Sequence, residues 1–171
     1  MKRIMTIGLL MVLFGIISLS GCGTGGGGES TPAPQPTTVV LKMSTQGTLP
    51  SGTQIGGIDV TIALPTGVTV KSVTSPPETD SGVVVASGLA VANSTVLSTY
   101  TAATSASSGK VRVLLANSNG FGTGEFMTIH CDIASGSTPT ASDFSLSGFA
   151  AKDLNGIVIS GLNSSFTAAF Q

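Results

Sequence analysis

The chain has 171 residues, a formal net charge of −1 at pH 7 and only 9% charged residues. This length suits a single folded domain with a sizeable core. Seven basic residues stand against eight acidic ones and form no basic stripe. Nucleic acid is therefore not expected as a partner, because its binding depends on clustered Lys and Arg that neutralise phosphates.

The N-terminus carries the first distinctive pattern. Lys2 and Arg3 precede an apolar run over residues 4–19, and Ser20-Gly21-Cys22 follows. A basic start, an apolar stretch shorter than a typical membrane span, and small residues before one cysteine resemble the signal peptide and lipobox of bacterial lipoproteins. An uncleaved signal anchor and an ordinary secretory peptide are the alternatives.

The lipoprotein resemblance implies that residues 1–21 are removed and that Cys22 is acylated, which attaches the chain to a lipid bilayer. Since Gly23 rather than an aspartate follows the cysteine, the resemblance also implies an outer-membrane destination. We therefore expect the protein in the cell envelope, facing either the periplasm or the surface. With Cys22 lipidated, Cys131 has no partner, so no internal disulfide is expected.

Residues 22–38 predict an unfolded tether, because a polyglycine stretch is followed by a segment with three alternating prolines. Residues 39–171 then show a β pattern throughout, with short apolar alternations separated by Gly, Asn and Ser turns. No window has the apolar spacing of a long helix. The expected strands cover residues 39–44, 58–64, 68–73, 83–85, 95–100, 110–115, 125–133, 144–149, 157–159 and 165–170.

Many short strands at regular spacing predict an all-β fold, a two-sheet β-sandwich of about nine strands in Greek-key or jelly-roll order. The order of several segments resembles the cohesin domain, within the wider set of carbohydrate-binding-like sandwiches. The segments that carry the resemblance are residues 57–65, 67–70, 109–117, 122–129 and 149–156.

The cohesin resemblance implies a nine-stranded jelly roll over residues 39–171 whose flat sheet face binds another protein, in known cases a dockerin. No short motif identifies the contacting positions, so no individual binding residue is transferred. The chain also departs from cellulosomal scaffolds, because it has a single module, no visible dockerin and an expected lipid anchor.

The residues do not predict catalysis. The one histidine, His130, is adjacent to Cys131 in an expected strand, so the two side chains point to opposite faces and form no Cys–His pair. No cofactor is expected. Asp153 and Asn155 faintly suggest a calcium loop, but an Asp side chain that caps its own turn explains the same pattern more simply.

In the strand over residues 125–133, alternation places Phe126, Thr128 and His130 on the outward face. Phe121 follows an expected turn over residues 117–120. Together these four side chains are candidates for an exposed partner surface. Alternatively, an opposing sheet edge or a loop covers the two phenylalanines.

These expectations describe a non-catalytic, membrane-anchored lipoprotein of the cell envelope whose sandwich binds a protein. One alternative is a polysaccharide-binding module, which the absence of Trp and the single Tyr disfavour. A second alternative is a structural protein of the cell surface or of an appendage.

Overall fold

The computed structural model describes residues 34–73 and 77–171. The predicted signal peptide, Cys22 and most of the predicted tether lie outside the described residues. Within the described ranges no helix is long and apolar enough to cross a membrane. The described residues form nine strands: β1 (Thr38–Gln46), β2 (Ile55–Leu64), β3 (Val68–Thr69), β4 (Val84–Ala86), β5 (Ser94–Thr101), β6 (Gly109–Phe121), β7 (Glu125–Ile133), β8 (Ser145–Lys152) and β9 (Asn163–Phe170).

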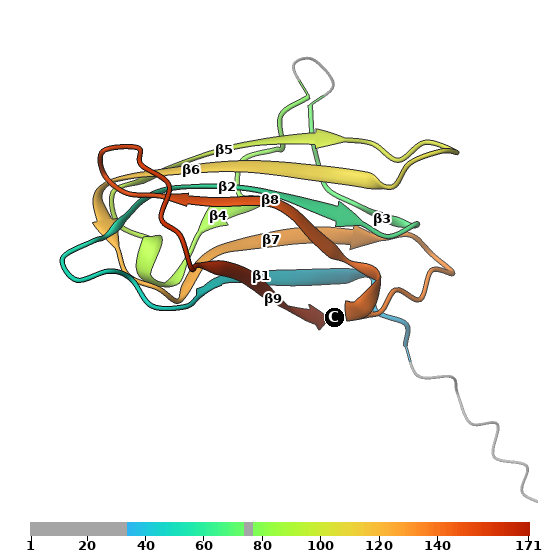
Figure 1. The fold of residues 1–171 in the computed structure, drawn as a ribbon. Helices are drawn as coiled ribbons and strands as arrows, with labels where there is room; N and C mark the ends of the chain where they lie inside the picture. The colour runs from blue at the N-terminus through green and yellow to red at the C-terminus, as the bar shows by residue number, and fades with distance from the viewer. Residues whose placement is uncertain (1–33, 74–76) are drawn as a thin grey trace, which may run out of the picture. The chain divides into compact units, whose positions relative to one another are not determined.

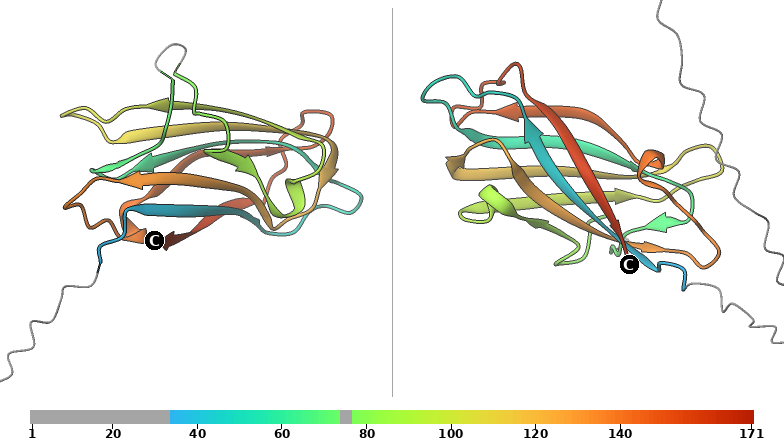
Figure 2. Two further views of the ribbon diagram at one scale, coloured as in Figure 1. Left: turned by 180° about the vertical axis from the view of Figure 1, so that it is seen from behind. Right: turned by 90° about the horizontal axis from the view of Figure 1, so that it is seen from below.

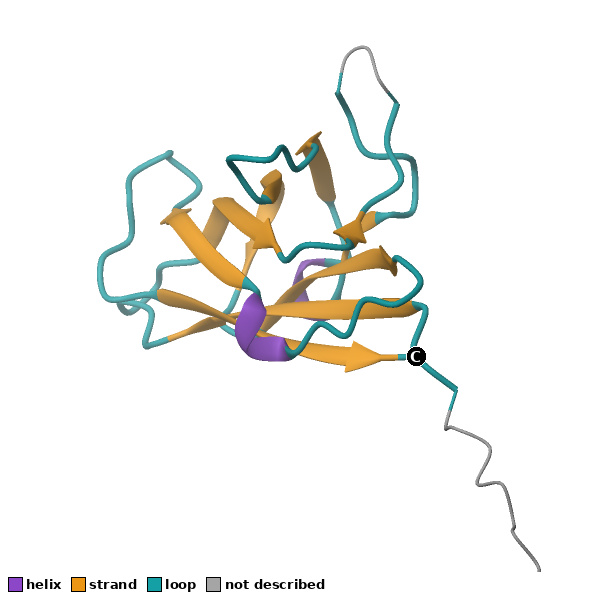
Figure 3. Ribbon diagram, turned by 90° about the vertical axis from the view of Figure 1, so that its right-hand side faces the viewer, coloured by secondary structure: helices purple, strands orange, loops and turns teal. Residues whose placement is uncertain are grey.

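The strands form two antiparallel sheets that pack face to face (Figure 1). One sheet has the order β3-β7-β1-β9, with β4 also paired to β7, and the other has the order β5-β6-β2-β8. Two short 3-10 helices, η1 (Gly88–Ala90) and η2 (Ala141–Asp143), lie in the connections (Figure 3). The structure confirms the predicted all-β sandwich of about nine strands.

The core fills the space between the sheets because alternate residues of each strand point inward. In β2, Ile58, Val60, Ile62 and Leu64 are all buried, while the residues between them are partly exposed. β6 repeats the pattern with Val111, Val113 and Leu115. The chain passes from one sheet to the other at most of its connections, as expected for a Greek-key or jelly-roll sandwich.

Three predicted elements differ in the structure. Of the strand expected over residues 68–73, only Val68–Thr69 forms β3. The sequence predicts a turn over residues 117–120, but these residues lie inside β6. The pairing of β2 with β6 passes from Gly57 opposite Ala116 to Ile55 opposite Phe121, so residues 117–120 bulge out of the ladder opposite Gly56. Residues 157–159 form no strand of their own and instead fold back on the end of β8 through a single bridge between Lys152 and Val158.

The described chain enters and leaves the sandwich at the same end (Figure 2). The Thr37 N–H donates to the carbonyl oxygen of Gln171 at 2.7 Å, and the Ile133 N–H donates to the Thr37 carbonyl at 2.8 Å. The folded domain therefore begins slightly before the predicted boundary at Val39, because Thr37 is already hydrogen-bonded to two segments of the sandwich.

Candidate functional site

Three of the four residues predicted to form a partner surface are buried. Phe126 and Phe121 have 0% and 5% exposure and Thr128 has 8%, whereas His130 is exposed. The predicted exposure of the two phenylalanines is therefore wrong, and the alternative that other parts of the chain cover them is correct.

A β-bulge explains the burial of Phe126. Met43 of β1 pairs with Met127, but the next residue, Ser44, pairs with Glu125, so Phe126 is the extra residue of the bulge. A bulge redirects a side chain and breaks the simple alternation. Phe126 and Met127 are both fully buried as a result.

Phe121 is buried because the polar segment before it is not an exposed turn. Asn117, itself only 4% exposed, donates from Nδ2 to the Ala92 carbonyl at 2.7 Å and to Ser94 Oγ at 2.8 Å. Its Oδ1 accepts the N–H of Asn119 at 3.0 Å. These bonds hold the bulge against the neighbouring connection and let Phe121 end β6 in the core.

The Asp153 carboxylate accepts hydrogen bonds from backbone N–H groups of its own loop. Oδ1 accepts backbone N–H groups from Asn155 at 2.9 Å and Ile157 at 2.8 Å. The bond to the Ile157 N–H is the main cause of the lowered pKa of Asp153. The described residues contain no group of three or more His, Cys, Asp or Glu side chains arranged to hold a metal ion. The turn-capping explanation therefore accounts for Asp153 and Asn155.

Cys131 and His130 point to opposite sides of their sheet, as predicted. Cys131 is 2% exposed, and burial is the main cause that raises the pKa of its thiol to about 12. The thiol is thus protonated at neutral pH and enclosed in the core. Such a cysteine is unreactive as a nucleophile.

The most distinctive surface of the described residues is the outer face of the sheet β5-β6-β2-β8, and we call it the Leu97–Leu114 face. Leu97 of β5 pairs directly with Leu114 of β6, and these side chains are 63% and 42% exposed. On the next strand, Asp59 lies opposite Leu114. Large apolar side chains placed opposite each other on a solvent-facing sheet do not serve the core.

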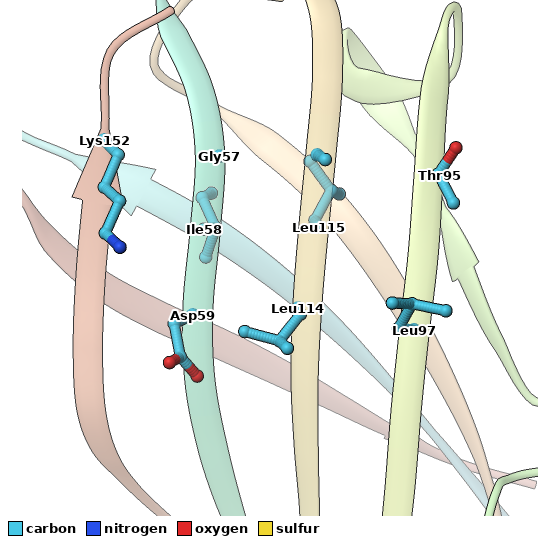
Figure 4. Close-up of a pocket in the computed structure, with 9 residues that line it drawn as sticks. Gly57, Ile58, Asp59, Thr95, Leu97, Leu114, Leu115 and Lys152 are labelled. Atoms are coloured by element: carbon cyan, nitrogen blue, oxygen red, sulfur yellow. The ribbon is translucent and has the colours of Figure 1, made fainter. Parts of the chain in front are cut away.

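A shallow depression of about 250 Å³ lies beside the leucine pair (Figure 4). Its floor is low because the row next to the leucines, Thr95, Ala116 and Gly57, carries small side chains or none. Lys152 of β8, which pairs with Gly57, lines the same depression at its far side. The face therefore offers an apolar edge, a flat floor and a cation.

Charge on this face is mostly positive. Lys110, Arg112 and Lys152 are exposed there, against the carboxylate of Asp59 and, beside the leucine pair, that of Glu78. Arg112 binds that carboxylate in a bidentate manner, with donor–acceptor distances of 2.8 and 3.2 Å. Asp59 is thus neutralised, and the two lysines remain unpaired among the described residues. Glu78 lies at the outer edge of β5, where it bridges to Thr99.

Alternation in the sequence places Leu114 beside Lys110 and Arg112 on one face of a strand, with Val111, Val113 and Leu115 on the other. A leucine among solvent-facing charges was the available signal for this surface. Leu97 gave no comparable signal, since its relation to Leu114 depends on which strands are neighbours. The two became a pair only through the register of β5 and β6.

No family model matches the sequence, and comparison with curated proteins finds no match. Among solved structures, the fold is similar to a protein described as a non-cellulosomal cohesin from the hyperthermophilic archaeon Archaeoglobus fulgidus. The identity is 17%, the match covers 74% of this chain and 75% of that chain, and the TM-score is 0.47.

Proposed function

We propose that this chain is a non-catalytic lipoprotein of the cell envelope, anchored through acylated Cys22, whose sandwich binds a protein partner through the Leu97–Leu114 face. The observation that carries the binding proposal is the exposed, cross-strand leucine pair beside a flat floor. The lipobox pattern at Cys22 carries the anchoring proposal.

The leucine pair supplies a modest but useful part of the binding free energy. The exposed fractions of 63% and 42% together amount to about one fully exposed leucine side chain. Burying one such side chain is worth about 1.5–3 kcal/mol, which corresponds to roughly a ten- to hundredfold change in Kd. The remaining affinity must come from polar contacts around the pair, to which Arg112 and Lys152 contribute donors.

The exposed side chains favour a protein over a polysaccharide. The large hydrophobic residues exposed in the described ranges are all Val, Leu or Ile. Tyr100, the only tyrosine, is 8% exposed. Sugar rings are usually bound on exposed aromatic platforms, and aliphatic side chains instead suit apolar anchors from a protein partner.

Site-specific photo-crosslinking in the cells that make this chain tests the binding face. A photoreactive residue at Thr95, beside the leucine pair, should give an adduct of defined mass that protease removes. Leu114→Lys should abolish this adduct, because it places a third unpaired cation where the apolar anchor binds. The same photoreactive residue at His130, exposed on the other sheet, is the matched control and should give no such adduct.

Identical adducts from Thr95 and His130, or an adduct at Thr95 that Leu114→Lys leaves unchanged, would contradict the binding face. An adduct that resists protease but yields to glycosidases would instead support the polysaccharide alternative.

The anchor is tested separately. Cys22→Ser should move the chain from the membrane fraction to the soluble fraction, and continued membrane association would refute acylation as the anchor.

A further inference from the structure

Three of the four sheet edges in the described residues are protected against pairing with another strand. The edge of β5 is covered by the connection between β3 and β4, because the Tyr100 N–H donates to the Pro77 carbonyl and the Thr79 N–H donates to the Ser98 carbonyl. The edge beside β7 carries only β3 and β4, which have two and three residues. Very short edge strands and covering segments are common devices against unwanted pairing.

The edge of β8 is protected in two ways. Its register with β2 shifts between Asp59 and Thr61 around Gly148, which has a φ of +63°. Its C-terminal end is covered by the folded-back loop, where the Ile159 N–H donates to Ala151 at 2.8 Å. A bulge and a covering loop both prevent a second strand from pairing along β8.

β9 has none of these protections. It pairs residue by residue with β1 from Asn163 to Phe170 without a register shift. The strand NSSFTAAF contains no charged residue and no proline. Among the described residues, β1 is its only strand partner. An edge strand of eight regular, uncharged residues is a template for strand addition.

The bonds at the end of β9 show which backbone groups face outward. The Gln171 N–H donates to Thr38 at 2.9 Å, and the Thr38 N–H donates back to Gln171 at 3.1 Å. Such reciprocal pairs alternate along an antiparallel ladder, so Ala169, Thr167, Ser165 and Asn163 also direct their backbone groups toward β1. The backbone groups of Ser164, Phe166, Ala168 and Phe170 therefore point away from the sheet.

We infer that the free edge of β9 pairs with β9 of a second copy of this chain, antiparallel and with the two-fold axis at Thr167. In this register Phe166 lies opposite Ala168 of the other copy, and Ser164 lies opposite Phe170. All four outward-facing residues of each strand are then used, which gives about eight backbone hydrogen bonds across the axis. Thr167 lies opposite itself on the outer face.

The chemistry of β9 suits a second copy. A two-fold axis requires the same surface on both partners. Two copies of β9 that pair antiparallel meet this condition, and the inward faces of both strands then lie on the same side of the joined sheet. Because β9 carries no charge, self-pairing brings no like charges together. The inward residues Phe166, Ala168 and Phe170 are only partly buried, and pairing sets each large side chain beside a small or polar one. Thr–Thr pairs across strands are favourable.

Cysteine cross-linking of the full chain under a mild oxidant tests this register. Directly opposed residues that are not hydrogen-bonded have Cα atoms about 4.5 Å apart, within the range that a disulfide bridges. Thr167→Cys should therefore give a disulfide-linked dimer well above the wild-type background. Ala169→Cys is the matched control, since Ala169 is also exposed but lies about 14 Å from its counterpart in this register. It should stay at background.

A second pair of variants makes the test independent of disulfide geometry. Thr167→Lys places two cations directly opposite each other and should weaken self-association about fivefold at low salt. Ala169→Lys, with its charges separated by more than a Debye length at physiological salt, should weaken it far less. Sedimentation equilibrium of the full chain in mild detergent measures both effects. Equal cross-linking of Thr167→Cys and Ala169→Cys, or identical sedimentation of the two lysine variants, would overturn the inference.

Discussion

Replacement of Phe126 by alanine tests whether this side chain is buried, as in the structure, or exposed, as simple strand alternation predicts. Alternation along β7 places Phe126 on the solvent-facing side, where truncation changes the free energy of unfolding by less than about 0.5 kcal/mol. In the structure Phe126 is the extra residue of a bulge and is fully buried. Truncating a buried phenylalanine costs about 3–5 kcal/mol, from lost burial and from the cavity that remains.

A loss of this size is easy to measure, because a domain of this length is stable by only about 5–15 kcal/mol. Trp is absent, so unfolding in urea is best followed by far-ultraviolet circular dichroism. Leu97→Ala is the control, since Leu97 is 63% exposed and should shift the midpoint little. If Phe126→Ala and Leu97→Ala have equally small effects, the bulge in β7 is wrong.

Two further predictions concern buried polar groups. Burial raises the pKa of the Cys131 thiol from 9.0 to about 12, so the folded state holds this proton more tightly than the unfolded state. The contribution of this thiol to the free energy of unfolding is complete below pH 9 and is lost as the pH rises toward 12. In Cys131→Val, thermal melts should therefore show a flatter dependence of stability on pH over this range. Asn117→Ala leaves the Ala92 carbonyl without its donor and should cost about 1–3 kcal/mol, whereas Asn119→Ala, at an exposed position, should leave the urea midpoint nearly unchanged.

The architecture was predictable because burial in a sandwich has a period of two. Ile58 to Leu64 and Met127 to Ile133 alternate so regularly that their inward faces can be read from the residues alone. The inward residues of both alternations are buried as predicted, Cys131 among them, whereas Thr128 on the outward side of the second is buried as well. Apart from residues 117–120, the glycine and asparagine turns that separate most strands had local causes, so their positions were predicted correctly.

The errors arose where long-range pairing overrides local chemistry. Residues 117–120 have strong turn residues, but the β2 pairings of Ala116 and Phe121 on either side of them and the side-chain bonds of Asn117 keep them inside β6. Phe126 is buried because β1 and β7 are out of step by one residue. Neither fact depends on nearby sequence, since both are decided by a partner strand far away in the chain.

The candidate binding face was only partly predictable for the same reason. Leu114 among charged neighbours is visible from alternation, but its partner Leu97 lies on β5 and the low floor at Gly57 lies on β2. Which strands are neighbours in a sandwich is a property of topology. The two outermost strands, β5 and β8, complete the face and could not be assigned to it from local patterns.

The central position of β1 bears on how the molecule transmits force. β1 is hydrogen-bonded along both sides, to β7 and to β9, and the chain enters it directly at Thr38. A force applied at Thr38 along the axis of β1 would act perpendicular to the hydrogen bonds of both ladders, so both ladders would resist it together rather than opening one hydrogen bond at a time.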